Sequence, residues 1–253
     1  MMSIRIRVGL ASMIVGTLVF AGSATAEDEG FTSLFDGDLS KWIIPEGDND
    51  HWKVIEQDGE KVIDYDARSE AEGNKNLVSK DEFGDFVLKI EWKIKETPFI
   101  NPGVRYVLPD GSHARDVNGE ELTLALPDSD SGVYLRDMRG KSQINMWCWP
   151  IGSGEVYGYR MDKSLPPEVR AGVTPRTQAD KPVGEWNEFE ITLKGDRLKV
   201  VLNDITVIED AELPGIPERG PLALQHHGNY RDGKYTGSPS LVQFRNIRIK
   251  SLD

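Results

Sequence analysis

The sequence has one cysteine, Cys148, so no intramolecular disulfide can form and the fold must be stabilised by its core. It also has fewer basic than acidic residues, 30 Lys and Arg against 42 Asp and Glu, which gives a formal net charge of −12. An acidic surface repels phosphate backbones and anionic headgroups, which argues against nucleic acids and membranes as partners. The sequence contains no repeat of solenoid or propeller length.

The only long apolar stretch lies at the beginning of the chain. Arg5 and Arg7 precede a mostly apolar run over Val8–Gly22, and Ala24–Ala26 is a small-x-small cleavage pattern followed by Glu27. We therefore expect residues 1–26 to be a signal peptide, with an uncleaved anchor helix as the alternative. The prediction is an exported protein, periplasmic or secreted, without membrane insertion after cleavage. Residues 27–253 are expected to form a single domain.

Short segments with a period of two dominate the rest of the chain. From Phe86 to Ile94, apolar residues alternate with polar ones, as in a strand with one buried and one solvated face. Turn dipeptides such as Asp58-Gly59 and Gly195-Asp196 separate several of these segments. The other expected strands are 51–57, 62–66, 76–79, 132–136, 143–149, 188–194, 198–203, 222–227 and 241–250. The fold class predicted is all-β, a sandwich or jelly roll with little helix.

Two segments depart from this pattern. Thr97–Asp130 is rich in proline and in turn dipeptides, and we expect it to form an added hairpin excursion that shapes a ligand site. Pro166–Arg170 is the one place where prolines favour a short helical turn.

Eight motifs, in order along the chain, resemble the 3-keto-disaccharide hydrolase domain family. They are 34–42 (LFDGDLSKW), 84–88 (GDFVL), 131–136 (SGVYLR), 143–147 (QINMW), 154–158 (GEVYG), 181–187 (KPVGEWN), 224–228 (LQHHG) and 244–247 (FRNI). The resemblance implies a concanavalin A-like β-sandwich with a concave carbohydrate-facing sheet. It also implies cleavage of glycosides oxidised to a ketone at C3 of the sugar.

A ketone at C3 acidifies the C2 proton, and loss of that proton expels the C1 substituent before water adds. Such a reaction needs a base, an acid and donors for the enolate oxygen, but no glycosidase carboxylate pair. The alternative from another class is a non-catalytic carbohydrate-binding module, which the same sandwich would serve. A scaffold in a multi-protein assembly would instead show a flat apolar patch and no pocket.

One predicted strand carries a candidate sugar platform. Gln143, Asn145, Trp147 and Trp149 share one face, on which amides could bind hydroxyls and flat rings could pack on C–H faces. The alternative is that both tryptophans belong to the core and the amides face solvent.

The remaining candidates come from three other segments. Tyr134 is predicted to bind substrate beside Arg136, which would stabilise an enolate oxygen or else pair with a surface acid. Gln225 is predicted to bind substrate next to His227, a general acid or base unless it is structural. Glu155, in a Gly-rich loop, is the preferred catalytic carboxylate, although loop acids are usually just solvated.

No metal or cofactor site is predicted. His226 and His227 point to opposite faces of a strand and so cannot chelate one ion. Asp128–Gly132 offers oxygen ligands but lacks the further carboxylate of a strong calcium site. The acids of Glu56–Glu60 flank a hairpin turn and cannot line one strand face, unlike those of sandwich glucanases. The sequence carries no signal for an oligomeric state.

Overall fold

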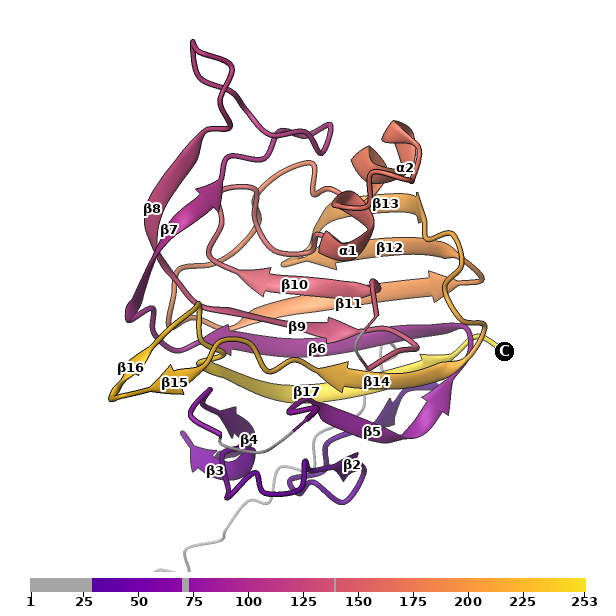
Figure 1. The fold of residues 1–253 in the computed structure, drawn as a ribbon. Coiled ribbons are helices and arrows are strands. Elements are labelled where there is room, and N and C mark those ends of the chain that lie inside the picture. Colours follow the sequence, from indigo (N-terminus) through magenta and orange to yellow (C-terminus); the bar gives the residue numbers. More distant parts are fainter. Residues whose placement is uncertain (1–28, 70–72, 139) are drawn as a thin grey trace, which may run out of the picture.

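Two large antiparallel β-sheets stacked face to face form the sandwich of this protein (Figure 1). The computed structural model describes residues 29–69, 73–138 and 140–253; the signal peptide predicted for residues 1–26 lies outside this part. Within these residues, neither helix has the length and apolar character required to cross a bilayer. The predicted all-β sandwich is confirmed.

The larger sheet has eight strands and forms the back layer in Figure 1. In spatial order these are β13 (Ile205–Glu212), β12 (Arg197–Leu202), β11 (Asn187–Lys194), β6 (Phe86–Ile94), β17 (Val242–Ser251), β4 (Glu60–Tyr65) and β3 (Lys53–Gln57), with β1 (Thr32–Ser33) also paired to β17. The expected strand 86–94 has the predicted bounds, whereas β13 was not anticipated from the sequence.

The smaller sheet has five strands and forms the front layer (Figure 1). Its order is β10 (Gln143–Trp147), β9 (Asp130–Tyr134), β14 (Gly220–Leu224), β5 (Leu77–Phe83) and β2 (Trp42–Ile43). Antiparallel pairing places Gln143 opposite Tyr134, and Trp147 opposite Asp130. This register fixes which side chains meet on the outer face of the sheet.

The core lies between the two sheets. On β6, Phe86, Leu88 and Ile90 are at most 1% exposed, and on β10 Ile144 and Met146 are fully buried. These residues belong to one apolar cluster drawn from both sheets. Each such side chain contributes roughly 1.5–3 kcal/mol by leaving water. The residues that alternate with Ile144 and Met146 therefore face outward, away from this core.

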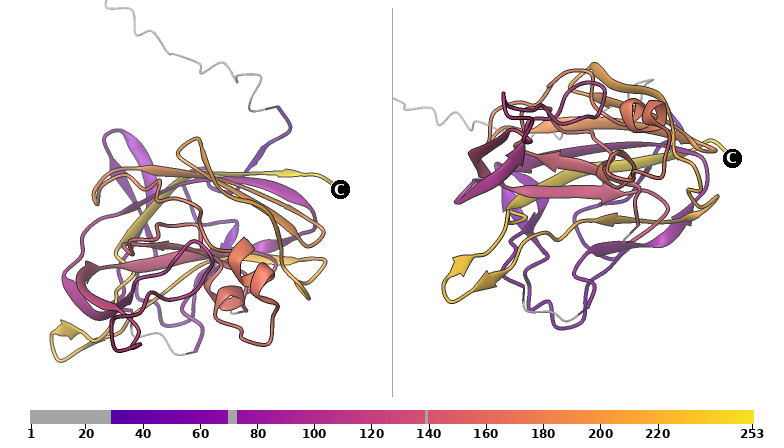
Figure 2. Two further views of the ribbon diagram at one scale, coloured as in Figure 1. Left: turned by 90° about the horizontal axis from the view of Figure 1, so that it is seen from above. Right: turned by 45° about the horizontal axis from the view of Figure 1, so that its top comes forward.

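Two additions flank the front sheet beside β10. The predicted excursion forms an arm, residues 99–128, whose strands are β7 (Phe99–Arg105) and β8 (Thr123–Asp128). Two short helices, α1 (Tyr157–Arg160) and α2 (Pro167–Gly172), follow β10 in the chain; α2 confirms the predicted helical turn. Figure 2 shows the arm and the helices on the same side of the sandwich as the front sheet. A small hairpin, β15 (Tyr230–Arg231) and β16 (Lys234–Tyr235), projects near the arm.

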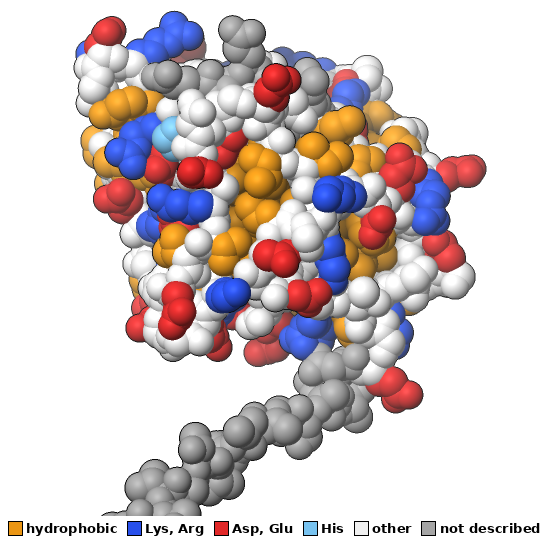
Figure 3. Space-filling model, turned by 90° about the horizontal axis from the view of Figure 1, so that it is seen from below, with side chains coloured by type: hydrophobic (Ala, Val, Ile, Leu, Met, Phe, Trp, Pro, Cys, Tyr) orange, Lys and Arg blue, Asp and Glu red, His pale blue; other side chains and the backbone are white. Residues whose placement is uncertain are grey.

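The surface seen from below in Figure 3 mixes residue types. Groups of apolar side chains on this face are separated by acidic and basic ones. A scaffold protein would instead present a flat, continuous apolar patch. The candidate ligand-binding pocket lies on a different surface, the outer face of the front sheet.

Candidate functional site

A pocket of about 410 Å³ lies on the outer face of the front sheet, beside the arm. Its walls come from β9, β10, the arm, α1 and the chain that follows β14. The lining residues are Asn101, Gly103, Arg105, Asp130, Gln143, Asn145, Trp147, Trp149, Tyr157, Gln225, His227 and Ser238. Six of the nine residues that the sequence proposed for the site are among them, so alternation along the strands predicted this face correctly.

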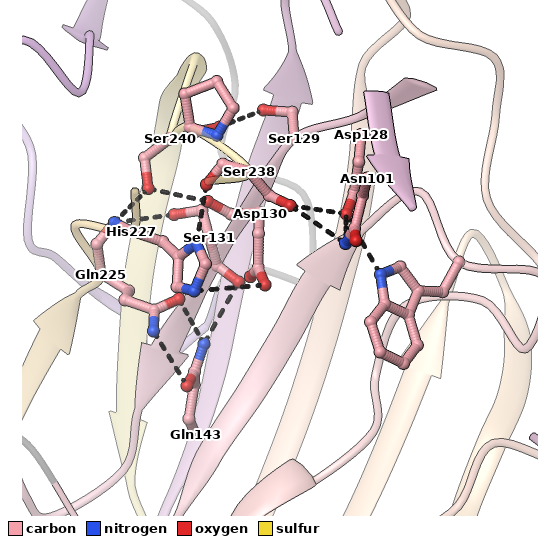
Figure 4. A network of polar contacts seen from close by, with 12 residues as sticks. Asn101, Asp128, Ser129, Asp130, Ser131, Gln143, Gln225, His227, Ser238 and Ser240 are labelled. Atoms are coloured by element: carbon pink, nitrogen blue, oxygen red, sulfur yellow. Dashed lines mark hydrogen bonds and ion pairs between the residues drawn. The ribbon is translucent and has the colours of Figure 1, made fainter. Parts of the chain in front are cut away.

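Asp130 and His227 form an acid–base pair in this pocket (Figure 4). The Nε2 atom of His227 lies 3.9 Å from the Asp130 carboxylate. Its Nδ1 atom is 2.6 Å from the carbonyl oxygen of Ser238, which requires the proton on Nδ1. Nε2 therefore faces the pocket, free to hold or release a second proton. The His227 side chain is 42% exposed and that of Asp130 is 16% exposed, so a ligand can reach the pair.

The surroundings shift both pKa values of the pair. Burial raises the pKa of Asp130 to about 6, against a lowering influence of His227 and a further rise from Asp128. Burial lowers the pKa of His227, but the Asp130 carboxylate and the Ser238 carbonyl outweigh it, so the pKa lies above its ordinary value of 6.5. Near neutral pH this arrangement favours a carboxylate beside an imidazolium, that is, one base and one acid.

The neighbouring histidine takes no part in this pocket. His226 points to the opposite side of the chain, where its Nδ1 atom lies 2.7 Å from the hydroxyl of Tyr65. Burial lowers the pKa of His226 to about 4. The two histidines thus face different ways, as the sequence predicted.

Asp128 anchors the arm to the pocket. Its Oδ2 atom accepts hydrogen bonds from Asn101 Nδ2 at 2.8 Å, from the Ser238 hydroxyl at 2.7 Å and from Trp149 Nε1 at 3.2 Å (Figure 4). Asp128 is 1% exposed and its carboxylate accepts three hydrogen bonds, so its role is to hold the segments of the pocket wall together. Asp130 is left as the carboxylate of the pocket that can take up a proton.

Two glutamines meet across β9 below the acid–base pair (Figure 4). Gln143 Nε2 donates to Gln225 Oε1, and Gln225 Nε2 donates to Gln143 Oε1 at 3.1 Å and to the Tyr134 hydroxyl at 3.2 Å. Gly132 lies between them, and a Cβ there would be 2.5 Å from Gln143 Nε2. The glycine is required because the same Cβ would also lie 2.6 Å from the carbonyl oxygen of Ile144, a backbone atom that cannot move aside as a flexible side chain could. Tyr134 therefore supports Gln225 and does not line the pocket.

The tryptophans lie on the predicted face, but not as an open platform. Trp147 and Trp149 stack on each other with ring centroids 4.2 Å apart and planes at 4°. They are only 3% and 8% exposed, because Val104, Leu124 and Leu126 of the arm pack against this pair. A sugar can touch only a small part of each ring. Both alternatives were partly right: the rings face the site, and they also belong to a small apolar cluster.

Arg136 lies outside the pocket. β9 ends at Tyr134, and Arg136 has φ = 55°, which breaks the alternation that predicted a shared face with Tyr134. Its guanidinium donates to the carbonyl oxygens of Gly84 and Gly195, each at 2.8 Å, and to Asp85 Oδ1 at 2.7 Å. It borders a separate hollow of about 810 Å³ at the end of the strands. These contacts join loops together, so Arg136 acts as a structural clamp in this geometry.

Glu155 is also placed away from the pocket. It is fully buried and forms an ion pair with Arg160 of α1, which is 2% exposed. The carbonyl oxygen of Glu155 accepts a hydrogen bond from the Asn145 backbone, which ties its loop to β10. The structure therefore does not bring Glu155, Arg136 and His227 together. In the described residues, no group of three or more His, Cys, Asp or Glu is arranged to hold a metal ion.

Residues 30–250 match the family model described as the 3-keto-alpha-glucoside-1,2-lyase-like domain. The chain belongs to this family. No curated protein matches it. Two solved structures from Parabacteroides distasonis, both named only provisionally as glycosyl hydrolases, share the fold of this lyase-like domain. One is 21% identical with a TM-score of 0.56, covering 88% of this chain and 84% of that one. The other is 20% identical with a TM-score of 0.54, covering 91% and 99%.

Sequence reasoning missed several pocket residues of this lyase-like domain. Asp130 lies two residues before Gly132 and four before Tyr134, so counting back along β9 in steps of two would have found it. Ser238 and Asn101 carry no such signal, because the loop that holds Ser238 and the strand β7 that holds Asn101 are brought to the pocket by tertiary packing. Arg105 is likewise delivered by the arm.

Proposed function

We propose that this protein cleaves glycosides that carry a ketone at C3, with Asp130 as the base and His227 as the acid. The observation that carries this proposal is the pair itself: a carboxylate with a pKa of about 6 beside a histidine, both in a 410 Å³ pocket. Ordinary glycosidases use two carboxylates on either side of the bond, and here Asp128 is held by three donors. Family membership supports the same chemistry.

In the proposed reaction, Asp130 removes the proton from C2, and the electron pair delocalises into the C3 carbonyl. The C1–O bond then breaks, a double bond forms between C1 and C2, and His227 gives its Nε2 proton to the departing oxygen. Water then adds at C1 and gives a proton to His227, while Asp130 returns its proton to C2, which yields the free 3-keto sugar and restores both side chains. Asn145 and Arg105 line the pocket and supply donors for the enolate oxygen.

The second candidate is a carbohydrate-binding module without catalysis. The amides of Gln143, Asn145 and Gln225 on one face favour it, because such groups recognise sugar hydroxyls. Incubation with a chromogenic 3-keto-glucoside and with its unoxidised parent separates the two functions. Release from the 3-keto compound alone supports the lyase, release from the parent alone indicates an ordinary glycosidase, and binding without release supports the module. The predicted signal peptide places the reaction outside the cytoplasm under this proposal.

The pH dependence should be bell-shaped. Asp130 must be ionised to act as a base, so kcat/KM falls below about pH 6. His227 must be protonated to act as an acid, so kcat/KM also falls once the pH exceeds its pKa, which is raised above 6.5. His227→Gln should remove the alkaline limb, whereas His51→Gln, outside the pocket, should leave it in place. An unchanged alkaline limb in His227→Gln would refute the assignment of the acid.

A further inference from the structure

A second, smaller pocket lies where the arm approaches α1 and α2, and it is strongly basic. It has a volume of about 300 Å³, and its charged lining groups are Arg105, Arg115, Arg160, Lys163 and Arg170 against the single carboxylate of Glu121. The chain as a whole carries a net charge of −12. The basic pocket is therefore a positively charged site in a protein whose net charge is negative. Such a site attracts anions.

The single carboxylate of the basic pocket is already engaged. Glu121 Oε2 accepts hydrogen bonds from Arg105 Nε at 3.1 Å and from His113 Nδ1 at 3.0 Å. His113 Nε2 in turn accepts one from Arg160 Nη1 at 2.8 Å, so the imidazole is neutral. Its pKa is lowered, chiefly by burial, in keeping with this state. The chain Glu121–His113–Arg160 joins the arm to α1 and holds the wall of the basic pocket in place.

Donor capacity remains on the cationic side chains. Arg160 already forms the ion pair with Glu155, but among the described residues its Nη2 atom and the Nε atom of Arg170 are buried without a hydrogen-bond partner. Arg160 is 2% exposed, and burial together with Arg105 and Arg170 lowers its pKa to about 10. Buried donors without acceptors are costly, and an anion with several oxygens would satisfy them.

The basic pocket adjoins the candidate site. Arg105 lines both, with Asp130 and His227 on one side and Arg115 and Arg170 on the other. A glycoside whose reacting ring lies beside Asp130 can therefore extend past Arg105 into the basic pocket.

We propose that the basic pocket is a subsite for an anionic group, a carboxylate or a sulfate ester, on the part of the glycoside remote from the reacting ring. The position of that ring rests on the proposed function. Arginine suits this role because its planar guanidinium pairs with two oxygens of such anions at once.

The test compares three 3-keto-glucosides of one para-substituted phenol, which carries a carboxylate, a sulfate ester or a methyl ester of the carboxylate. We expect kcat/KM to be about tenfold higher for at least one anionic aglycone than for the methyl ester. Arg170→Gln and Lys163→Gln should abolish this preference and leave the neutral substrate within about twofold of wild type. Arg176→Gln is the matched control, since Arg176 pairs with Glu209 outside the pocket.

Binding of the three unoxidised parent glucosides, measured by calorimetry, separates the two proposals. Tighter binding of an anionic parent that Lys163→Gln weakens supports the subsite even if no 3-keto compound is cleaved; the proposed reaction alone would then fail. Equal binding of all three parents overturns the subsite and leaves the reaction untouched. Lys163 is exposed, so this variant keeps the test valid if Arg170→Gln does not fold.

Discussion

Asp130→Asn should lower kcat/KM on a 3-keto-glucoside by about 10²–10⁴-fold, the usual loss when a general base is removed. Asparagine has the same shape but cannot take up a proton. The variant therefore loses the base, while the packing against His227, 3.9 Å away, changes little. The measurement is steady-state kinetics at the pH optimum, with folding checked by circular dichroism.

The same substitution should not lower the unfolding temperature at pH 7. The folded-state pKa of Asp130 is raised from 3.8 to about 6, so ionisation opposes folding increasingly from about pH 4 to pH 6 and fully above it. Asparagine escapes this cost. Asp180→Asn is the matched control, because burial raises the pKa of Asp180 as well but the residue does not line the pocket. Equal loss of activity in both variants, or full activity in Asp130→Asn, would contradict the assignment.

Arg136→Met should destabilise the protein by about 3 kcal/mol, because it removes a buried guanidinium and leaves the carbonyl oxygens of Gly84 and Gly195 without their donor. The guanidinium is 1% exposed and donates to backbone carbonyls as well as to Asp85. For a domain of this size the loss corresponds to a fall of roughly 6–12 °C in the unfolding temperature. Activity per folded molecule, measured well below that temperature, should stay within about threefold, because Arg136 does not reach the pocket.

Arg219→Met provides the comparison for this prediction. Its side chain is 59% exposed and donates to the Glu82 carbonyl and to Asp253, so its loss should change stability by less than about 1 kcal/mol. If Arg136→Met keeps its unfolding temperature but loses activity, Arg136 contributes to the reaction, as the strand pattern originally suggested.

Alternation along single strands made much of the site predictable. Because β10 buries Ile144 and Met146, the opposite placement of Gln143, Asn145 and Trp147 followed from a period of two. The prediction failed beyond the end of a strand. The residue at which a strand ends depends on backbone dihedral angles, which the pattern of residue types does not reveal. Arg136 is the example: its positive φ turns the side chain away from the face of Tyr134.

Other features depended on contacts between distant segments. The pairing of Glu155 with Arg160 needs the unexpected turn of α1, and the cover over Trp147 needs the arm to fold back over β10. Ser238 reaches Asp128 across 110 positions of sequence. Such contacts are set by tertiary packing, so neither a local period nor a motif could have revealed them.

Strand β9 links the integrity of the site to the accuracy of folding. Asp130 lines the pocket and Gly132 lies on the same side of the strand, whereas Ser131 and Val133, which alternate with them, point to the other side and are buried. A slip of one position against β10 would drive a carboxylate into the core and place a side chain where the two glutamines meet. Molecules with that error would fail to fold stably, in addition to lacking a complete site. Misassembled copies should therefore be cleared as unfolded protein and should not persist as folded, non-functional ones.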